Sequence, residues 1–84
     1  MSKGGLTEDE KFIIALYEMT QQQADPEEPL DAYIVGQSIG MQTRRVDAIS
    51  TQLMRTNFLK RQDKHFVYLT TNGVNLAKQL LENI

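Results

Sequence analysis

The chain has 84 residues, which suffice for one domain with a modest hydrophobic core but not for two. Hydrophobic residues make up 40% and charged residues 24%, as in ordinary soluble globular proteins, and no apolar run is long enough to span a bilayer. There is no cysteine, so disulfide frameworks and thiolate chemistry are excluded, and residues 1–5 are not followed by the apolar stretch of a secretory signal. We therefore expect a cytoplasmic protein that does not enter a membrane.

The net charge of −2 conceals two blocks of opposite sign. Residues 1–31 contain eight acidic residues and two lysines, a net charge of −6, whereas residues 32–84 contain seven basic and three acidic residues, a net charge of +4. The basic block favours a surface for nucleic acid, because clustered lysine and arginine attract phosphates. The alternative is that both blocks are solvated faces, and a pI near 5.2 supports it, since strongly DNA-binding domains tend to be basic.

A first helix is predicted to begin after Thr7, because Thr7-Glu8-Asp9-Glu10 has the pattern of a capping box. The three acids also suit the positive end of a helix dipole, so we interpret them as capping residues rather than as metal ligands or an acid-base pair. Apolar residues at helical spacing then predict a buried stripe: Phe12, Ile13, Leu16, Tyr17 and Met19. The helix is expected to end before the proline-containing segment 25–29.

A second helix is predicted to begin after Asp31, which is a good N-cap, with Leu30 and Val35 spaced as a hydrophobic staple. Gly40 stands where a left-handed residue would end this helix and turn the chain. Gly36 either permits close helix packing or merely weakens the helix by about 1 kcal/mol. The expected apolar face consists of Ala32, Tyr33, Ile34, Val35, Gly36 and Ile39.

A third helix is predicted to start near Gln42 or Thr43 and to present two different faces. Asp47 lies near the edge between them and counts against DNA binding, unless it pairs with a neighbouring arginine or accepts a hydrogen bond from cytosine. The residues expected to pack inward are Val46, Ile49, Ser50, Leu53 and Asn57. The residues expected to point outward are Arg44, Ala48, Thr51 and Arg55, flanked by Arg45 and Gln52.

The outward face of this third helix has the chemistry of a DNA-reading surface. Ala48 and Thr51 are small enough to let a helix sit deep in a groove. The forked donors of Arg44 and Arg55 can bind phosphate or the O6 and N7 atoms of guanine, and Gln52 can pair with adenine. The alternative is an ordinary solvated face, since arginine is simply a good helix former.

A β-hairpin is predicted around Asp63-Lys64, with core-facing residues at a period of two: Leu59, Val67 and Leu69. Basic residues gather at or near its tip, where they can reach a phosphate backbone or a minor groove: Lys60, Arg61, Lys64 and His65. The alternative is edge protection, because lysines on a short exposed hairpin deter sheet-to-sheet aggregation. With no cysteine and no second histidine to complete a metal site, we interpret His65 as a surface residue of the hairpin.

The order of these segments resembles small winged helix-turn-helix transcription regulators, including those of the MarR type. The resemblance rests on the turn Ile39-Gly40-Met41, the following segment Gln42-Thr43-Arg44-Arg45-Val46, the basic hairpin, and Leu69-Thr70-Thr71-Asn72-Gly73. In that family a Leu-Thr-x-x-Gly segment typically follows the second strand of the wing. The resemblance covers roughly residues 7–84 and implies a mainly α fold with a small antiparallel hairpin, namely a three-helix core, a wing and a C-terminal helix. Residues 1–84 would form this single domain, with residues 1–6 as a flexible N-terminus.

The C-terminal helix is predicted to cover the core with one apolar face, made of Val74, Ala77, Leu81 and Ile84. Leu76 and Leu80 lie one turn apart on a neighbouring face. Either they widen the contact with the core, or they are exposed and form part of a self-complementary patch for a homodimer. In a dimer, two recognition helices about one DNA turn apart can read a palindrome.

The function predicted from the sequence is sequence-specific binding of double-stranded DNA by a transcriptional regulator, with the third helix in the major groove and the wing on the backbone. The residues expected to contact DNA are Thr43, Arg44, Arg45, Ala48, Thr51, Gln52, Arg55, Lys60, Arg61, Lys64 and His65. The alternative is a winged-helix adaptor that binds another protein and no DNA, because the fold does not fix the function.

An enzyme is not expected, because the sequence contains no phosphate-cradling glycine-rich loop and no constellation of nucleophile and base. The acids Asp25, Glu27, Glu28 and Asp31 lack the alternating ligand pattern of a calcium loop, and two prolines interrupt them. No cofactor, metal or membrane partner is therefore predicted.

Overall fold

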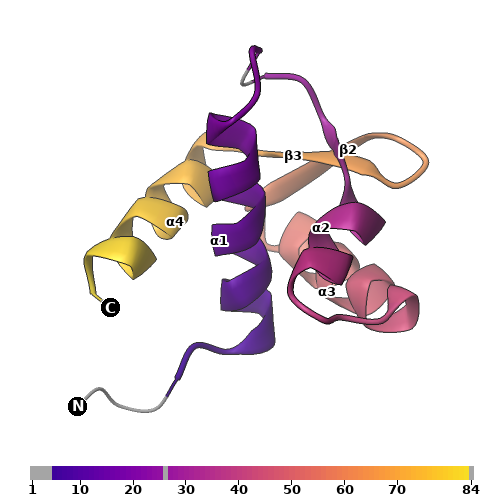
Figure 1. Cartoon of the computed structure of the whole chain (residues 1–84), viewed down its shortest axis with the longest axis horizontal. Helices are drawn as coiled ribbons and strands as arrows, with labels where there is room; N and C mark the ends of the chain where they lie inside the picture. Colours follow the sequence, from indigo (N-terminus) through magenta and orange to yellow (C-terminus); the bar gives the residue numbers. More distant parts are fainter. Residues whose placement is uncertain (1–4, 26, 84) are drawn as a thin grey trace.

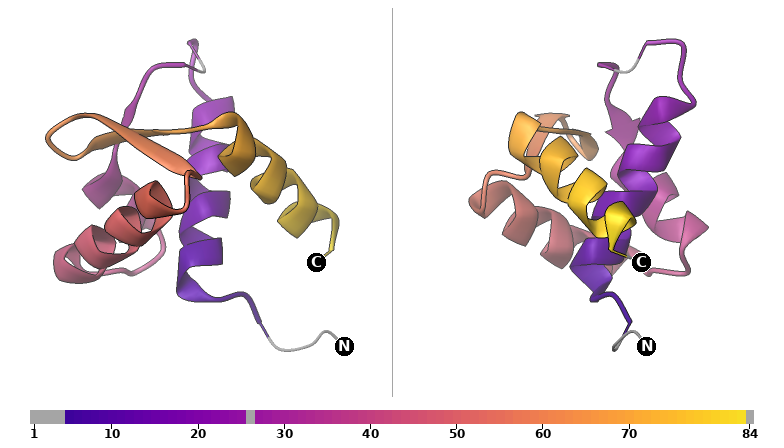
Figure 2. Two further views of the ribbon diagram at one scale, coloured as in Figure 1. Left: turned by 180° about the vertical axis from the view of Figure 1, so that it is seen from behind. Right: turned by 90° about the vertical axis from the view of Figure 1, so that its left-hand side faces the viewer.

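The computed structural model describes residues 5–25 and 27–83. Its elements, in chain order, are α1 (Glu8–Gln21), β1 (Leu30–Asp31), α2 (Ala32–Ser38), α3 (Thr43–Arg55), β2 (Leu59–Asp63), β3 (Phe66–Leu69) and α4 (Thr71–Glu82). Helix α1 stands in the middle, with α4 on one side and α2, α3 and the β2–β3 hairpin on the other (Figure 1; Figure 2). This is a winged helix-turn-helix, so the predicted fold class is confirmed. Of the N-terminus expected to be flexible, residues 1–4 lie outside the described residues.

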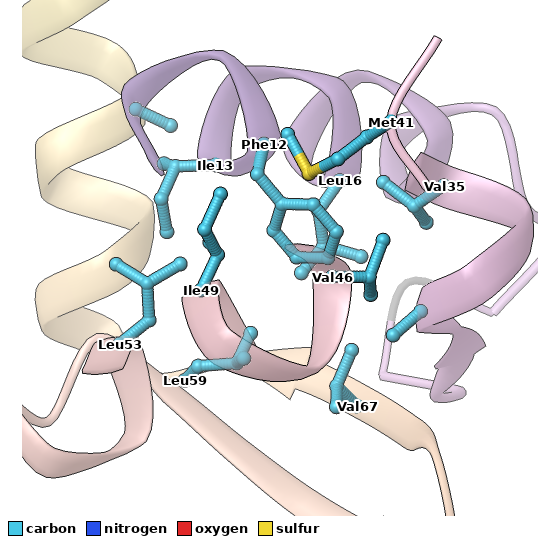
Figure 3. Close-up of a cluster of buried hydrophobic side chains, with 12 residues drawn as sticks. Phe12, Ile13, Leu16, Val35, Met41, Val46, Ile49, Leu53, Leu59 and Val67 are labelled. Atoms are coloured by element: carbon cyan, nitrogen blue, oxygen red, sulfur yellow. The ribbon is translucent and has the colours of Figure 1, made fainter. Parts of the chain in front are cut away.

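The core forms around α1, whose start is fixed by the predicted capping box. The Thr7 side chain accepts a hydrogen bond from the Glu10 amide at 3.3 Å, and the Glu10 carboxylate accepts one from the Thr7 amide at 2.9 Å. Phe12 is fully buried in the middle of the cluster, with side chains of α2, α3 and the sheet around it (Figure 3). Removing such apolar surface from water is the main term that stabilises a domain of this size.

The sheet has three antiparallel strands in the order β1-β3-β2, whereas the sequence predicted a two-stranded hairpin. The additional strand β1 pairs Leu30 with Val67 and Asp31 with Phe66. A strand of two residues is too short to produce an alternating pattern, which is why sequence reasoning missed it. Its effect is to fasten the segment before α2 to the inner strand of the wing.

The turn between α2 and α3 closes as expected at Gly40, which has a φ of +74°. The Gly40 amide donates to the Gln37 carbonyl at 3.1 Å and the Met41 amide to the Gly36 carbonyl at 2.8 Å, as in a Schellman motif. A Cβ added to Gly36 would lie 2.3 Å from Cγ2 of Val46 on α3. Gly36 therefore permits close packing of α2 on α3, and does not merely weaken the helix.

The predicted apolar face of α2 was too wide. Ala32, Val35 and Gly36 are buried, but Ile34 is 54% exposed and Ile39 is 37% exposed. A seven-residue helix can present only about one side to the core, because successive residues are separated by about 100°.

Helix α3 ends at Arg55, so the prediction that Asn57 belongs to its buried face was wrong. Asn57 adopts a left-handed conformation, with a φ of 67°, and terminates the helix. The Phe58 amide donates to the Leu53 carbonyl at 2.9 Å and the Asn57 amide to the Met54 carbonyl at 3.1 Å, which is a second Schellman motif. Asparagine is the residue that replaces glycine most readily at such a position.

The Leu69–Gly73 segment joins the end of α3 to the start of α4. The Thr70 hydroxyl donates to the Asn57 carbonyl at 2.6 Å and accepts from the Gly73 amide at 3.0 Å, which caps α4. The Thr70 amide donates to the Phe58 carbonyl at 3.2 Å. A Cβ on Gly73 would lie 2.1 Å from that same carbonyl oxygen, so only glycine fits there.

On α4, the predicted core-facing stripe was wrong in part. Ala77 is fully buried, but the larger side chains that pack against the core cluster are Leu76 and Leu80. Val74 and Leu81 are half-buried, and Ile84 lies outside the described residues. The sequence left open whether Leu76 and Leu80 widen the contact with the core or are exposed. The structure shows that both contact the core.

We predict that Gly73→Ala destabilises the protein by about 3 kcal/mol, because the methyl group meets a backbone carbonyl rather than a movable side chain. Urea unfolding measures this change in the free energy of unfolding. Gly5→Ala is the matched control, since nothing lies within 4 Å of the added methyl group, and its effect should stay within about 0.5 kcal/mol. If Gly73→Ala is as stable as the wild type, the close contact between Gly73 and the Phe58 carbonyl does not require glycine.

Candidate nucleic-acid interface

Burial of one side of α3 determines which residues the helix presents to solvent. Val46, Ile49, Ser50 and Leu53 are buried as predicted, and this fixes the rotation of the helix about its axis. The residues left exposed are the acid Asp47 and seven others: Thr43, Arg44, Arg45, Ala48, Thr51, Gln52 and Arg55. These seven are the residues of α3 that the sequence predicted as candidates for contact with DNA.

Arg45 forms an ion pair with an acidic residue of another helix. Its Nε lies 2.6 Å from Oε1 of Glu8 at the start of α1, and both side chains are about half exposed. An exposed ion pair contributes little to stability, typically less than about 1 kcal/mol, so a phosphate can displace the carboxylate at small cost. The contact was missed because Glu8 was assigned to capping alone.

Asp47 accepts a hydrogen bond from a residue that the sequence did not suggest as its partner. The Tyr33 hydroxyl of α2 donates to Oδ1 of Asp47 at 2.8 Å, in place of a neighbouring arginine. This hydrogen bond is the main reason that the pKa of Tyr33 is raised above its ordinary value of 10.0. The acid on the edge of α3 is thereby tied to α2.

The wing lies on the same side of α1 as α3, and α4 lies on the other side (Figure 2). Leu59 begins β2 in the core, and the rest of the strand is exposed. An irregularity in the pairing falls between Arg61 and Asp63, and Lys64 at the turn has a φ of 47°. Lys60, Arg61 and Lys64 are all exposed, as both contact with DNA and edge protection would require.

His65 is less accessible to a DNA backbone than the sequence suggested. Its Nε2 lies 3.2 Å from Oδ2 of Asp31, and its side chain is 34% exposed. Its ring stacks on Tyr33, with 4.5 Å between the ring centroids, and on Phe66, with 5.2 Å. The structure thus places His65 against the start of α2. No local signal reveals this contact, because it depends on the pairing of β1 with β3.

An open hollow of about 770 Å³ lies beside the wing, between the end of α1, the sheet and the start of α4. Two tyrosines, Tyr17 and Tyr68, contribute to its wall, and the charged residues among its described lining are Glu27 and Lys60. Within residues 5–25 and 27–83, no group of three or more histidine, cysteine or acidic residues is placed to hold a metal ion. No helix in that part of the chain is long and apolar enough to cross a membrane.

Comparison with known proteins supports the fold and goes no further. No protein-family model and no curated protein sequence matches the chain. Among solved structures, the crystal structure of SSV1 F-93 superposes with a TM-score of 0.60 over 94% of this chain and 88% of that chain, at 22% sequence identity. Because the identity is low, the likeness establishes a shared fold and leaves MarR-type properties unassigned. The chain is a small winged-helix protein that shares its fold with SSV1 F-93.

Proposed function

We propose that the protein binds double-stranded DNA in a sequence-specific manner and regulates transcription, with α3 in the major groove and the wing on the phosphate backbone. The observation that carries the proposal is the exposed side of α3, where small Ala48 and Thr51 lie between Arg44 and Arg55. The basic wing lies on the same side of α1 as α3 (Figure 2), so it can add phosphate contacts to those of the helix. The fold likeness to SSV1 F-93 is compatible with this role.

Within this proposal, base edges are read by Arg44 and Gln52, because their donors and acceptors match guanine and adenine in the major groove. Phosphates are contacted by Arg45, Arg55 and the wing residues. For Arg45 the phosphate replaces Glu8, whose carboxylate carries the same sign of charge. Phosphate contacts fix the orientation of the protein, and base contacts select the sequence.

We predict a steep dependence of DNA affinity on salt. If one subunit neutralises four phosphates, the logarithm of the association constant should fall with the logarithm of salt concentration at a slope of about −3.6. Arg44→Ala should cost about 1–3 kcal/mol and relax the preference at one base pair. Mobility shifts or fluorescence anisotropy at several salt concentrations measure both quantities. Lys78→Ala is the control, since Lys78 is an exposed residue of α4, on the far side of α1.

Two outcomes would contradict this prediction. Undiminished binding by the Arg44→Ala, Arg55→Ala double variant would show that α3 does not face the DNA. No binding to any duplex at low salt would favour the adaptor, which the overall acidity of the chain and the Arg45–Glu8 ion pair also favour.

For the wing, we predict that the triple variant Lys60→Ala, Arg61→Ala, Lys64→Asn binds all sequences more weakly and has a flatter salt slope. Asparagine is used at position 64 because it tolerates the left-handed conformation there. Because β2 is an edge strand, the alternative of edge protection predicts instead that the triple variant aggregates while each molecule binds DNA normally. Light scattering measures aggregation, and together with the binding assay it distinguishes phosphate contact from edge protection.

We further propose a homodimer that uses α4, where Leu76, Leu80 and Leu81 are half-buried. Sedimentation should then give a mass near twice 9.6 kDa. Leu76→Glu with Leu80→Glu should lower stability, because both leucines contact the core cluster. Leu81→Glu tests the dimer without that complication and should yield a folded monomer with weaker DNA binding. Wild-type protein that stays monomeric at high concentration and on DNA would rule the dimer out.

A further inference from the structure

Four side chains from four parts of the chain meet where the wing approaches α2: Asp31, Tyr33, Asp47 and His65. We call this group the clasp. His65, at the turn of the wing, contributes two of its contacts, the 3.2 Å approach of Nε2 to Asp31 Oδ2 and the stack on Tyr33, in which the ring planes are 19° apart. The backbone reinforces them, because the Ala32 amide donates to the His65 carbonyl at 2.9 Å. The wing is therefore joined to the first turn of α2.

The clasp continues from α2 to α3. Oδ1 of Asp31 accepts from the Tyr33 amide at 2.9 Å and caps α2, which leaves Oδ2 for His65. The Tyr33 hydroxyl then reaches Asp47 on α3 at 2.8 Å. Through Tyr33, the wing and α3 are thus held by one continuous set of contacts.

A winged-helix surface needs such a connection. A two-stranded hairpin is marginally stable by itself, and the outer strand of this one is exposed after Leu59. The third strand pairs with only two residues of β3. The clasp adds side-chain contacts between the turn of the wing and the helices to this limited backbone pairing.

We propose that Tyr33 and His65 are positioning residues that fix the wing relative to α3, and that protonation of His65 tightens this hold. The part of the inference that concerns DNA rests on the function proposed above. When protonated, His65 meets the Asp31 carboxylate as an ion pair, and charge-assisted hydrogen bonds are stronger than neutral ones. Because histidine ordinarily changes charge between about pH 5 and 8, measurements at the two ends of that range test this effect.

Two carboxylates lie around the stack of His65 on Tyr33. Asp31 of β1 faces His65 directly, and Asp47 of α3 accepts a hydrogen bond from the hydroxyl of Tyr33. Arg61 of β2 is the basic residue whose charge acts on Tyr33. His65 is also the single histidine of the sequence, so a variant without it removes any contribution of histidine to a response to pH.

The first test uses the free protein and needs no DNA. Hydrogen exchange of the Ala32 amide, corrected for the intrinsic effect of pH, reports opening of its bond to the His65 carbonyl. In the wild type, the protection should be about two- to fivefold greater at pH 5.5 than at pH 8, as for a partly exposed ion pair. The gain should disappear in His65→Ala and in Asp31→Asn, since asparagine keeps the N-cap but has no charge. If the Ala32 amide remains more protected at pH 5.5 than at pH 8 in both variants, the inference is overturned.

The role of Tyr33 is separated by two substitutions. Tyr33→Phe keeps the stack on His65 and should retain the protection of Ala32 within about twofold, whereas Tyr33→Leu loses the stack and should lower protection about fivefold. Urea unfolding of each variant at pH 8 shows whether the effect is local. Wild-type protection in a folded Tyr33→Leu protein would show that the ring does not position the wing.

The second test measures affinity for duplex DNA at pH 5.5 and 8. Wild-type protein should bind about two- to fivefold more tightly at pH 5.5, and Asp31→Asn should remove this difference although His65 is still present. If Asp31→Asn keeps the difference, His65 contacts phosphate directly and the clasp is not the cause. If no variant binds DNA while the exchange results hold, the proposed function fails and the positioning of the wing stands.

Discussion

The fold depends most on one close contact, the approach of Gly73 on α4 to the carbonyl of Phe58 at the start of the wing. That carbonyl also accepts from the Thr70 amide, and the neighbouring Asn57 carbonyl accepts from the Thr70 hydroxyl. The end of α3, both ends of the hairpin and the start of α4 are thereby joined at one place. Because Thr70 donates to both carbonyls, the two ends of the wing cannot separate without losing both hydrogen bonds.

A second close contact, between Gly36 and Val46, sets α3 against α2. It decides which face of α3 is buried, and therefore which residues any partner meets. The absence of a Cβ at position 36 lets the helices pack closely enough for Val46 to be fully buried. Function and stability are connected here, since a shift of α3 would move Arg44 and Arg55 together with the core.

Features that depend on neighbours in the chain were predicted from the sequence. The capping box at Thr7, the N-cap at Asp31 and the left-handed Gly40 involve residues within four positions of one another, so their side-chain chemistry suffices to recognise them. The exposed face of α3 followed from helical spacing. The Leu-Thr-x-x-Gly segment was noticed through a resemblance, and the structure supplies its physical reason in the contacts of Thr70 and Gly73.

Features that depend on distant residues could not be predicted. Arg45 and Glu8 are 37 positions apart, and Tyr33 and Asp47 are 14 positions apart. The strand β1 exists only because β3 passes beside it. Leu76 and Leu80 contact the core because of how α4 is rotated, which the apolar pattern alone left ambiguous. These contacts decide how much charge α3 presents and how the wing is held, so the sequence located the candidate surface but not its electrostatics.

The most direct test of the DNA-binding surface is an NMR titration of isotopically labelled protein with a short duplex at low salt. We expect the amide signals that move to belong to the exposed side of α3, including Arg44, Ala48 and Thr51, and to the wing around Lys60 and Lys64. Signals of α4 around Lys78 should stay in place, apart from any effect of dimerisation. Shifts confined to α1 and α4, or no shifts at any duplex concentration, would contradict it.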